Sequence, residues 1–280
     1  MTTVWDGAPQ PAPARLGLRG GIRVARRAVP AAFVVALGLA LLLLVRLVER
    51  PLCGLRRPVT PWITQGVCVA ALRLIGLRRV VRGAVMRGTG AVVANHVSWL
   101  DILALNASKR VYFVSKAEVA GWPGIGWLAR ATGTLFIRRH PREAARQKAL
   151  LGARLREGHR LLFFPEGTST DGRRVLRFKT TLFAAFYSPD LPRMQVQPVT
   201  LRYTAPEGAR ADVYGWWGDR GFAESLVAVL SLPRQGRVEV IYHPPLAVAA
   251  YPDRKALAAA AEAAVRLGLG PQAGGERAEA

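Results

Sequence analysis

Short runs of apolar, often β-branched residues alternate with helix-periodic stretches from residue 80 to residue 267. The short runs predict strands, and the stretches between them predict helices. Strands are predicted at 91–94, 111–115, 134–137, 161–164, 196–203 and 238–242. Helices are predicted at 99–106, 124–131, 142–157, 182–187, 223–230 and 254–267. This alternation is typical of a sheet covered by helices, so we predict one α/β domain with a mixed sheet.

The segment before this domain has a different pattern. Residues 28–45 contain no charged side chain, and this is about the shortest apolar length that can cross a bilayer. A cleaved signal peptide is not favoured, because Arg46 and Glu49 follow where small residues would be required. Residues 62–81 mix apolar side chains with arginines, which predicts a basic amphipathic helix in a membrane interface. An ordinary helix packed on the domain fits the same pattern.

These patterns divide the chain into four parts. Residues 1–27 form a basic N-terminal segment, and residues 28–82 contain the predicted membrane-associated helices. Residues 83–267 form the α/β domain, and residues 268–280 are predicted to be a flexible tail. Basic residues flank the apolar run on both sides, so the positive-inside rule gives it no orientation.

The charge of the chain narrows the choice of partner. Its 280 residues include 40 Lys and Arg against 18 Asp and Glu, a net charge of +22. Nucleic acid, an anionic membrane and phosphorylated metabolites all suit such a charge. The two cysteines, Cys53 and Cys68, predict neither a disulfide framework nor a metal site, because no Cys or His stands at ligand spacing. A reducing, cytoplasmic environment fits the domain.

A histidine and an aspartate follow the predicted strand at 91–94. On a continuous helix, His96 and Asp101 would point about 140° apart, so they can meet only if His96 lies in the turn before the helix. Asp101 could then hold one imidazole nitrogen and leave the other free to take a proton from a hydroxyl. Alternatively, Ser98 and Asp101 form a capping box, in which the acid only satisfies backbone donors.

Three further stretches carry candidate chemistry. The strand at 161–164 ends in Pro165-Glu166-Gly167, and ligand crevices of open α/β sheets lie at such strand ends. An exposed turn is the alternative there. The stretch 133–139 delivers Arg138 and Arg139 past a strand end, where they could bind a phosphate or lie in solvent. The stretch 197–201 predicts a buried strand whose proline marks an edge.

Together and in this order, the four stretches resemble the glycerolipid acyltransferase superfamily. Its bacterial lysophosphatidate acyltransferases carry an H-x4-D box, a G-x-x-F-I-x-R box, an F-P-E-G-T box and a later V-x-P-V strand. The matching residues lie between Ala91 and Tyr203. The family's N-terminal two-helix membrane motif is matched by the two segments before the domain.

The resemblance implies a role for each matched residue. His96 would be the general base, Asp101 would orient it, and Arg139 would hold the head group or phosphate of the acceptor. The implied substrate-binding residues are Gly133, Phe136, Arg138, Arg139, Glu166, Gly167, Thr168 and Lys179. An acceptor hydroxyl would attack the thioester of acyl-CoA or acyl carrier protein, with no metal, no other cofactor and no covalent acyl-enzyme.

The resemblance implies that the acceptor is 1-acyl-sn-glycerol-3-phosphate, which would give phosphatidic acid. The domain would then lie on the cytoplasmic side of the inner membrane, in contact with membrane lipid. One departure favours an alternative: many lysophosphatidate enzymes have E-G-T-R where this chain has Ser169 as the fourth residue. Lyso-ornithine lipid or another lysophospholipid is therefore the alternative acceptor.

Two other classes of protein explain parts of the sequence. A lipid esterase could use a His–Asp pair, but no G-x-S-x-G nucleophile motif is present. A basic, membrane-tethered nucleic-acid-binding protein fits the charge, but the chain has no groove-reading motif, and no nucleic-acid partner is expected. Trp216 and Trp217 would either seat the domain in the membrane interface or pack in its core.

Overall fold

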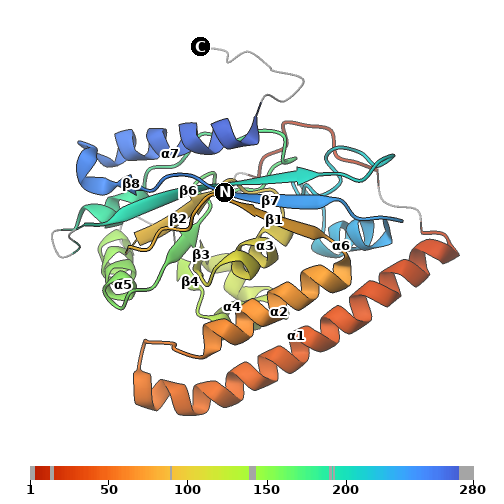
Figure 1. The fold of residues 1–280 in the computed structure, drawn as a ribbon, viewed down its shortest axis with the longest axis horizontal. Helices are drawn as coiled ribbons and strands as arrows, with labels where there is room; N and C mark the ends of the chain where they lie inside the picture. The colour runs from red at the N-terminus through yellow and green to blue at the C-terminus, as the bar shows by residue number, and fades with distance from the viewer. Residues whose placement is uncertain are drawn as a thin grey trace.

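The computed structural model describes residues 4–12, 16–88, 90–138, 143–188, 191 and 193–270. Its sheet has eight strands in the order β1-β7-β6-β2-β5-β3-β4, with β8 paired to β6 (Figure 1). The strands are β1 (Arg78–Arg82), β2 (Gly90–Ala94), β3 (Tyr112–Lys116), β4 (Leu135–Ile137), β5 (Leu161–Phe163), β6 (Gln195–Thr204), β7 (Arg237–Tyr242) and β8 (Leu246–Ala247). The pairs β6–β7 and β6–β8 are antiparallel and the other pairs are parallel, so the predicted mixed sheet is confirmed.

Helices cover both faces of the sheet, and α1 lies outside them. The α-helices are α1 (Leu18–Cys53), α2 (Thr60–Ile75), α3 (Leu100–Ser108), α4 (Ile125–Thr132), α5 (Ala144–Arg156), α6 (Phe222–Ser231) and α7 (Arg254–Leu269). The 3-10 helices are η1 (Ala117–Gly121), η3 (Leu182–Tyr187) and η4 (Val248–Ala250). In Figure 1, α7 lies above the sheet, while α1 and α2 run below it.

Strand β2 is at the centre of this arrangement, because its side chains alternate between two buried clusters. Ala91 and Val93 pack with side chains of α5, η3 and α7. Val92 and Ala94 pack with side chains of α2, α3 and α6. A strand covered on both faces reads as a continuous apolar run, which is why the sequence predicts it clearly.

The predicted helix at 62–81 is wrong in its last six residues. Helix α2 ends at Ile75, and Gly76 stops it with a φ of 87°, in the left-handed region that glycine favours. Arg78–Arg82 instead form the edge strand β1, which pairs in parallel with β7. Three arginines around two valines suit an edge strand, because one side of the strand stays in solvent.

Two further expectations change. The proline of the stretch 197–201 does not mark an edge: β6 is an interior strand, and Pro198 lies between the segment that pairs β8 and the segment that pairs β7. A residue without an N–H is tolerated at that gap. The first two residues of the predicted tail, 268 and 269, instead belong to α7, which continues to Leu269. Residues 271–280 lie outside the described residues.

Candidate active site

His96 and Asp101 meet at the carboxyl end of β2. His96 lies in the turn after the strand, and Asp101 lies in the first turn of α3. The distance between His96 Nδ1 and Asp101 Oδ2 is 2.7 Å, with Asp101 fully buried and His96 about 20% exposed. The turn geometry required by the sequence is therefore present, and it leaves Nε2 as the imidazole nitrogen that can accept a proton.

The same carboxylate also binds the backbone, so the contacts expected from both interpretations of Asp101 are present. Its Oδ2 accepts hydrogen bonds from the amides of Val97 at 2.6 Å and Ser98 at 3.0 Å. The Ser98 hydroxyl accepts from the amide of Leu100 at 3.2 Å. Asp101 thus fixes the turn that carries His96 while it holds the imidazole itself.

Tyr203 binds the second oxygen of the Asp101 carboxylate. The sequence did not predict this contact. The Tyr203 hydroxyl donates to Asp101 Oδ1 at 2.8 Å, and burial, followed by the charge of Asp101, raises the pKa of Tyr203 well above its ordinary value. Tyr203 is at the end of the strand predicted at 196–203, beside β2 in the sheet. One feature of the sequence could have indicated Tyr203: it ends a predicted strand, as the residues before His96 do.

Asn95 and Glu166 hold the backbone on either side of His96. The Asn95 amide donates to the Leu201 carbonyl at 3.0 Å and accepts from the Leu201 amide at 2.7 Å, which joins the ends of β2 and β6. Glu166 follows β5, and its carboxylate accepts from the amides of His96 and Leu176, each at 2.7 Å. Glu166 thus supports the turn that carries His96 from the neighbouring strand.

Burial has the largest effect on the pKa of the Glu166 carboxyl. It raises the pKa of this carboxyl from 4.5 to about 8, and the nearby charge of Asp101 acts in the same direction. The two backbone donors act in the opposite direction but are outweighed. Next to Glu166, Phe164 stacks on the His96 ring at 4.0 Å between centroids, which limits the imidazole to one plane.

The loop after Glu166 carries Gly167 and Thr168, and the N-terminal segment covers it. Gly167 has a φ of 76° in this turn. The Thr168 hydroxyl accepts from the amide of Trp5 at 3.3 Å. The Trp217 indole donates to the carbonyl of Ala8 at 3.0 Å. The first described residues therefore pack on the catalytic loop, a contact that the sequence did not predict.

The two adjacent tryptophans have different environments. Trp217 is buried in the core, while Trp216 is half-buried and packs edge-on against Trp122. The Ser169 hydroxyl donates to the carbonyl of Trp216. Lys179 has an exposed side chain, and its amide donates to the carbonyl of Pro165 at 3.0 Å.

The stretch 133–138 runs from one edge of the sheet to the other, because Arg138 follows β4 at the carboxyl end, the edge at which His96 follows β2. Gly133 ends α4 with a φ of 86° and precedes β4, so it lies at the opposite edge of the sheet from His96. Phe136 is half-buried within β4, and Arg138 follows the strand with an exposed side chain, 3.7 Å from Glu143. Arg139 lies outside the described residues.

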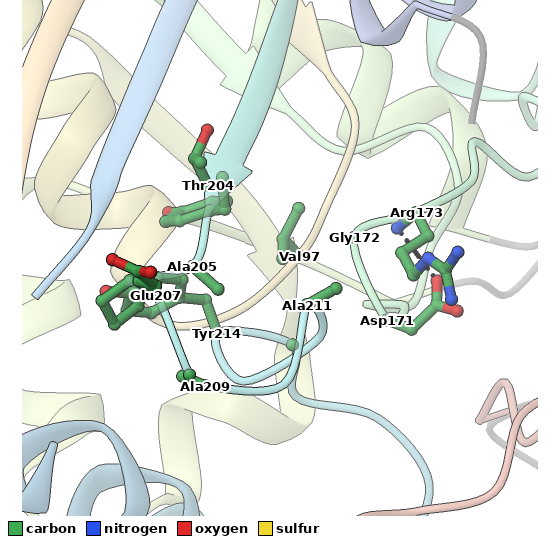
Figure 2. Close-up of a pocket in the computed structure, with 14 residues that line it drawn as sticks. Val97, Asp171, Gly172, Arg173, Thr204, Ala205, Glu207, Ala209, Ala211 and Tyr214 are labelled. Atoms are coloured by element: carbon green, nitrogen blue, oxygen red, sulfur yellow. Dashed lines mark hydrogen bonds between the residues drawn. The ribbon is translucent and has the colours of Figure 1, made fainter. Parts of the chain in front are cut away.

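A pocket of about 370 Å³ lies beside the catalytic turn. Val97 and Tyr203 line it where it adjoins the His96–Asp101 pair. Figure 2 shows Val97 between Glu207 on one side and Arg173 on the other. Within the described residues, no three His, Cys, Asp or Glu side chains gather as a metal-ligand group.

Comparison with known proteins identifies the family of this chain. A family model described as Acyltransferase matches residues 77–202. The lyso-ornithine lipid O-acyltransferase of Rhodobacter capsulatus is 60% identical over 268 residues, 95% of this chain and 97% of that protein. The chain belongs to the glycerolipid acyltransferase superfamily. It is an enzyme that acylates the hydroxyl of a lysolipid.

Two other members of the superfamily extend the comparison. The lyso-ornithine lipid O-acyltransferase of Rhizobium meliloti is 39% identical over 190 residues, 64% of each chain. The crystal structure of the 1-acyl-sn-glycerophosphate acyltransferase PlsC from Thermotoga maritima has a TM-score of 0.55 and 20% identity, covering 87% of this chain and 96% of that chain. The latter likeness establishes the fold.

Acyltransferases of this superfamily act on lipids, and the long helix of this chain agrees with that. Helix α1 is long and apolar enough to cross a membrane. Only 11% of its most apolar 18-residue stretch is buried inside the protein, so the rest of that stretch is open to lipid. The length of α1 exceeds the predicted apolar run of residues 28–45 at both ends. The enzyme is therefore membrane-associated.

Proposed function

We propose that this acyltransferase moves a fatty acyl group from a thioester carrier to the free hydroxyl of lyso-ornithine lipid. The observation that carries the proposal is the 60% identity, over nearly the whole length of both chains, to an enzyme with that name. This acceptor replaces 1-acyl-sn-glycerol-3-phosphate, which the motif resemblance implied.

The catalytic turn supports a general-base mechanism. His96 Nε2 takes the proton of the acceptor hydroxyl as the hydroxyl oxygen attacks the thioester carbonyl. Asp101 stabilises the imidazolium through Nδ1, as the buried acid of a Ser-His-Asp triad does. When the tetrahedral intermediate collapses, the C–S bond breaks and the imidazolium returns its proton to the leaving thiol.

The environment of Ser169 supports an acceptor without phosphate. Where lysophosphatidate enzymes often have a guanidinium, this chain has a small hydroxyl that is bound to the carbonyl of Trp216. An ornithine head group has an ammonium and a carboxylate instead of a phosphate. It has no need of that guanidinium.

The pocket beside Val97 supports the same acceptor. It contains the exposed carboxylate of Glu207 and the guanidinium of Arg173, which lie on opposite sides of Val97 in Figure 2. Opposite charges across a pocket suit a head group with both an ammonium and a carboxylate. Glu207 is the group we assign to the ammonium.

The donor and the location of the reaction follow from the chemistry. Acyl-CoA and acyl carrier protein are both thioesters with a thiol leaving group, and both are soluble in the cytoplasm. We therefore place the catalytic domain on the cytoplasmic face of the inner membrane, with α1 in contact with lipid.

A transfer assay tests the proposal. The purified full chain is given one labelled acyl-CoA, or the corresponding acyl carrier protein, with lyso-ornithine lipid, 1-acyl-sn-glycerol-3-phosphate or lysophosphatidylethanolamine. We expect lyso-ornithine lipid to give the highest kcat/KM. His96→Ala should lower that rate about 10²–10⁴-fold. Preference for the phosphate acceptor would reject this acceptor while keeping the acyltransferase assignment.

Glu207→Gln tests the head-group assignment separately. It should raise the KM for lyso-ornithine lipid severalfold and leave the KM for acyl-CoA unchanged, because only the ammonium contact is lost. The matched control is Glu118→Gln, which neutralises a carboxylate on η1 that does not line the pocket. Equal KM values for both variants would remove Glu207 from the acceptor site.

A further inference from the structure

A second pocket, of about 580 Å³, lies where the C-terminal end of α1 meets α4. Four of its lining residues are arginines: Arg46, Arg50, Arg57 and Arg130. The other described lining residues are Leu43, Gly54, Leu55 and Ala131, so no acidic side chain lines it within the described chain. The pocket combines four cations with an apolar rim.

This pocket is separate from the catalytic turn. Ala131 comes before β4, whereas His96 comes after β2, and the two strands run in the same direction through β5 and β3. The pocket and the catalytic turn are therefore at opposite edges of the sheet. The length of β2 alone separates these edges by about 16 Å, at roughly 3.3 Å per residue.

The protein groups behind the pocket add to its positive charge. Arg57 donates to the carbonyl of Ala131 at 2.7 Å, but the buried Nε atoms of Arg57 and Arg154 have no hydrogen-bond partner among the described residues. Burial, followed by the charges of Arg46 and Arg154, lowers the pKa of Arg57 to about 10. A bound anion would relieve this repulsion.

The nearest carboxylate does not neutralise the cluster. Glu49 lies 3.0 Å from Arg46, but its oxygens also accept hydrogen bonds from the amides of Val59 and Thr60. Arg50 and Arg130 are exposed, and Arg50 has no hydrogen bond or ion pair with another described residue. Arg130 donates to the carbonyl of Ala120 at 2.7 Å. The guanidinium of Arg50 and the remaining donors of Arg130 are therefore available to a ligand.

The rim indicates where such a ligand comes from. Leu43 and Leu55 are each 50% exposed at the pocket, and Leu47 and Leu52 of the same helix end are more exposed still. Apolar side chains beside arginines are typical of a surface that enters the lipid interface, where head-group phosphates are found. A soluble ligand would not need this apolar rim.

We propose that Arg46, Arg50, Arg57 and Arg130 form a binding site for the phosphate of an anionic membrane lipid, distinct from the catalytic site. Guanidinium groups bind phosphate through paired, charge-assisted hydrogen bonds. The bound lipid fixes the end of α1 and α4 against the membrane. This site does not depend on which lysolipid is the acceptor.

Lipid binding to the full chain in detergent tests the site. Native mass spectrometry compares retention of phosphatidylglycerol with retention of phosphatidylcholine of the same acyl chains. The variant Arg50→Ala/Arg130→Ala changes two exposed side chains and should keep the wild-type melting temperature. The matched control, Arg19→Ala/Arg26→Ala, removes two exposed arginines from the other end of α1.

We expect the wild type and the control to retain phosphatidylglycerol over phosphatidylcholine. The pocket variant should lose about tenfold or more of the affinity for phosphatidylglycerol, because two charge-assisted contacts are removed. Equal retention of the two lipids by the wild type, or equal loss in both variants, would overturn the proposal. Displacement of the lipid by equimolar coenzyme A or inorganic phosphate would assign the pocket to a soluble phosphate and would also overturn it.

Discussion

At the scale of single residues, Asp101 makes the contacts of both a helix cap and the proposed partner of a catalytic histidine. Its Oδ2 is shared by the His96 imidazole and the amides of Val97 and Ser98, and its Oδ1 is held by Tyr203. The capping and catalytic roles therefore cannot be separated by position. They can be separated by the choice of substitution.

Asp101→Asn and Asp101→Ala should differ in stability but not in activity. Asparagine keeps an oxygen for the two amides and can donate to Tyr203, so the melting temperature should change little. It carries no charge to stabilise the imidazolium, so kcat should fall on the order of 10²-fold or more. Alanine loses the charge as well, and it leaves two buried amides unpaired at a cost of about 1–3 kcal/mol each.

Calorimetry and single-substrate kinetics on the two purified variants check this expectation. If Asp101→Asn melts lower than the wild type and each folded molecule turns over normally, Asp101 is only a cap. Tyr203→Phe is the control for general disturbance of the site, because it removes one donor to Asp101 and leaves the carboxylate and its other partners in place.

Glu166 should make folding sensitive to pH. Its pKa is about 8 in the folded protein against an ordinary value of 4.5, so folding takes up a proton between these values. The contribution of Glu166 to stability is therefore fully present below about pH 4.5 and is lost as the pH rises towards 8. Glu166→Gln should have a weaker decline of melting temperature over this range.

Melting temperatures from pH 5 to pH 9 test the role of Glu166. The control is Glu207→Gln, whose exposed carboxylate should leave the wild-type slope unchanged. The same slope in Glu166→Gln as in the wild type would show that other groups cause the pH dependence.

At the scale of elements, the joint between α1 and α2 depends on one buried acid. Helix α2 begins after Val59, which cannot cap it with its side chain. Glu49 of α1 supplies the cap instead, because it accepts hydrogen bonds from the amides of Val59 and Thr60 and from the Thr60 hydroxyl. The turn between the two helices is thereby held by a side chain from the first of them.

Glu49→Ala should loosen this joint. Losing a helix cap costs about 0.5–2 kcal/mol, and the Thr60 amide is buried, so the upper end of the range is expected. Glu49→Gln keeps one acceptor and should lose less. Limited proteolysis between residues 54 and 59, together with melting temperature, measures the effect. Equal cleavage of the alanine variant and the wild type would exclude Glu49 as the cap.

The sequence predicted most elements because burial leaves a strong pattern. Strands β2, β5 and β6 lie between two helical layers, so their apolar runs are unmistakable. Strand β1 was missed because it is an edge strand with three arginines in five residues, and β8 because it has only two residues. Local pattern cannot show pairing with a distant edge.

Contacts between distant residues were also not predicted at the candidate active site. The spacing of His96 and Asp101 predicted their contact because the turn between them is local. The contacts of His96 with Glu166 and of Asp101 with Tyr203 join residues 70 and 102 positions apart. Only the strand order brings these residues together, and the strand order was not predicted from the sequence.

At the scale of the whole molecule, one side of the protein is suited to lipid. Leu37, Leu41 and Leu44 lie at helical spacing on α1 and are 58%, 48% and 62% exposed. Helix α7 is on the opposite side of the sheet (Figure 1), and its N-terminal Asp253 caps it in solvent. The apolar side also carries the arginine pocket, so hydrophobic and electrostatic contacts with the membrane coincide.

Attachment to the membrane should therefore resist salt. High salt screens surface charge but leaves apolar burial in place, so the wild type should stay in the membrane fraction after a high-salt wash. Leu41→Asp/Leu44→Asp should be released into the wash, because two charged side chains on the exposed apolar face of α1 oppose its burial in lipid. Leu150→Asp/Leu267→Asp changes two exposed leucines of α5 and α7 and should remain bound like the wild type. Release of the wild type by salt alone would show that the arginines provide the attachment. Equal retention of both double variants would place the exposed leucines of α1 outside the bilayer.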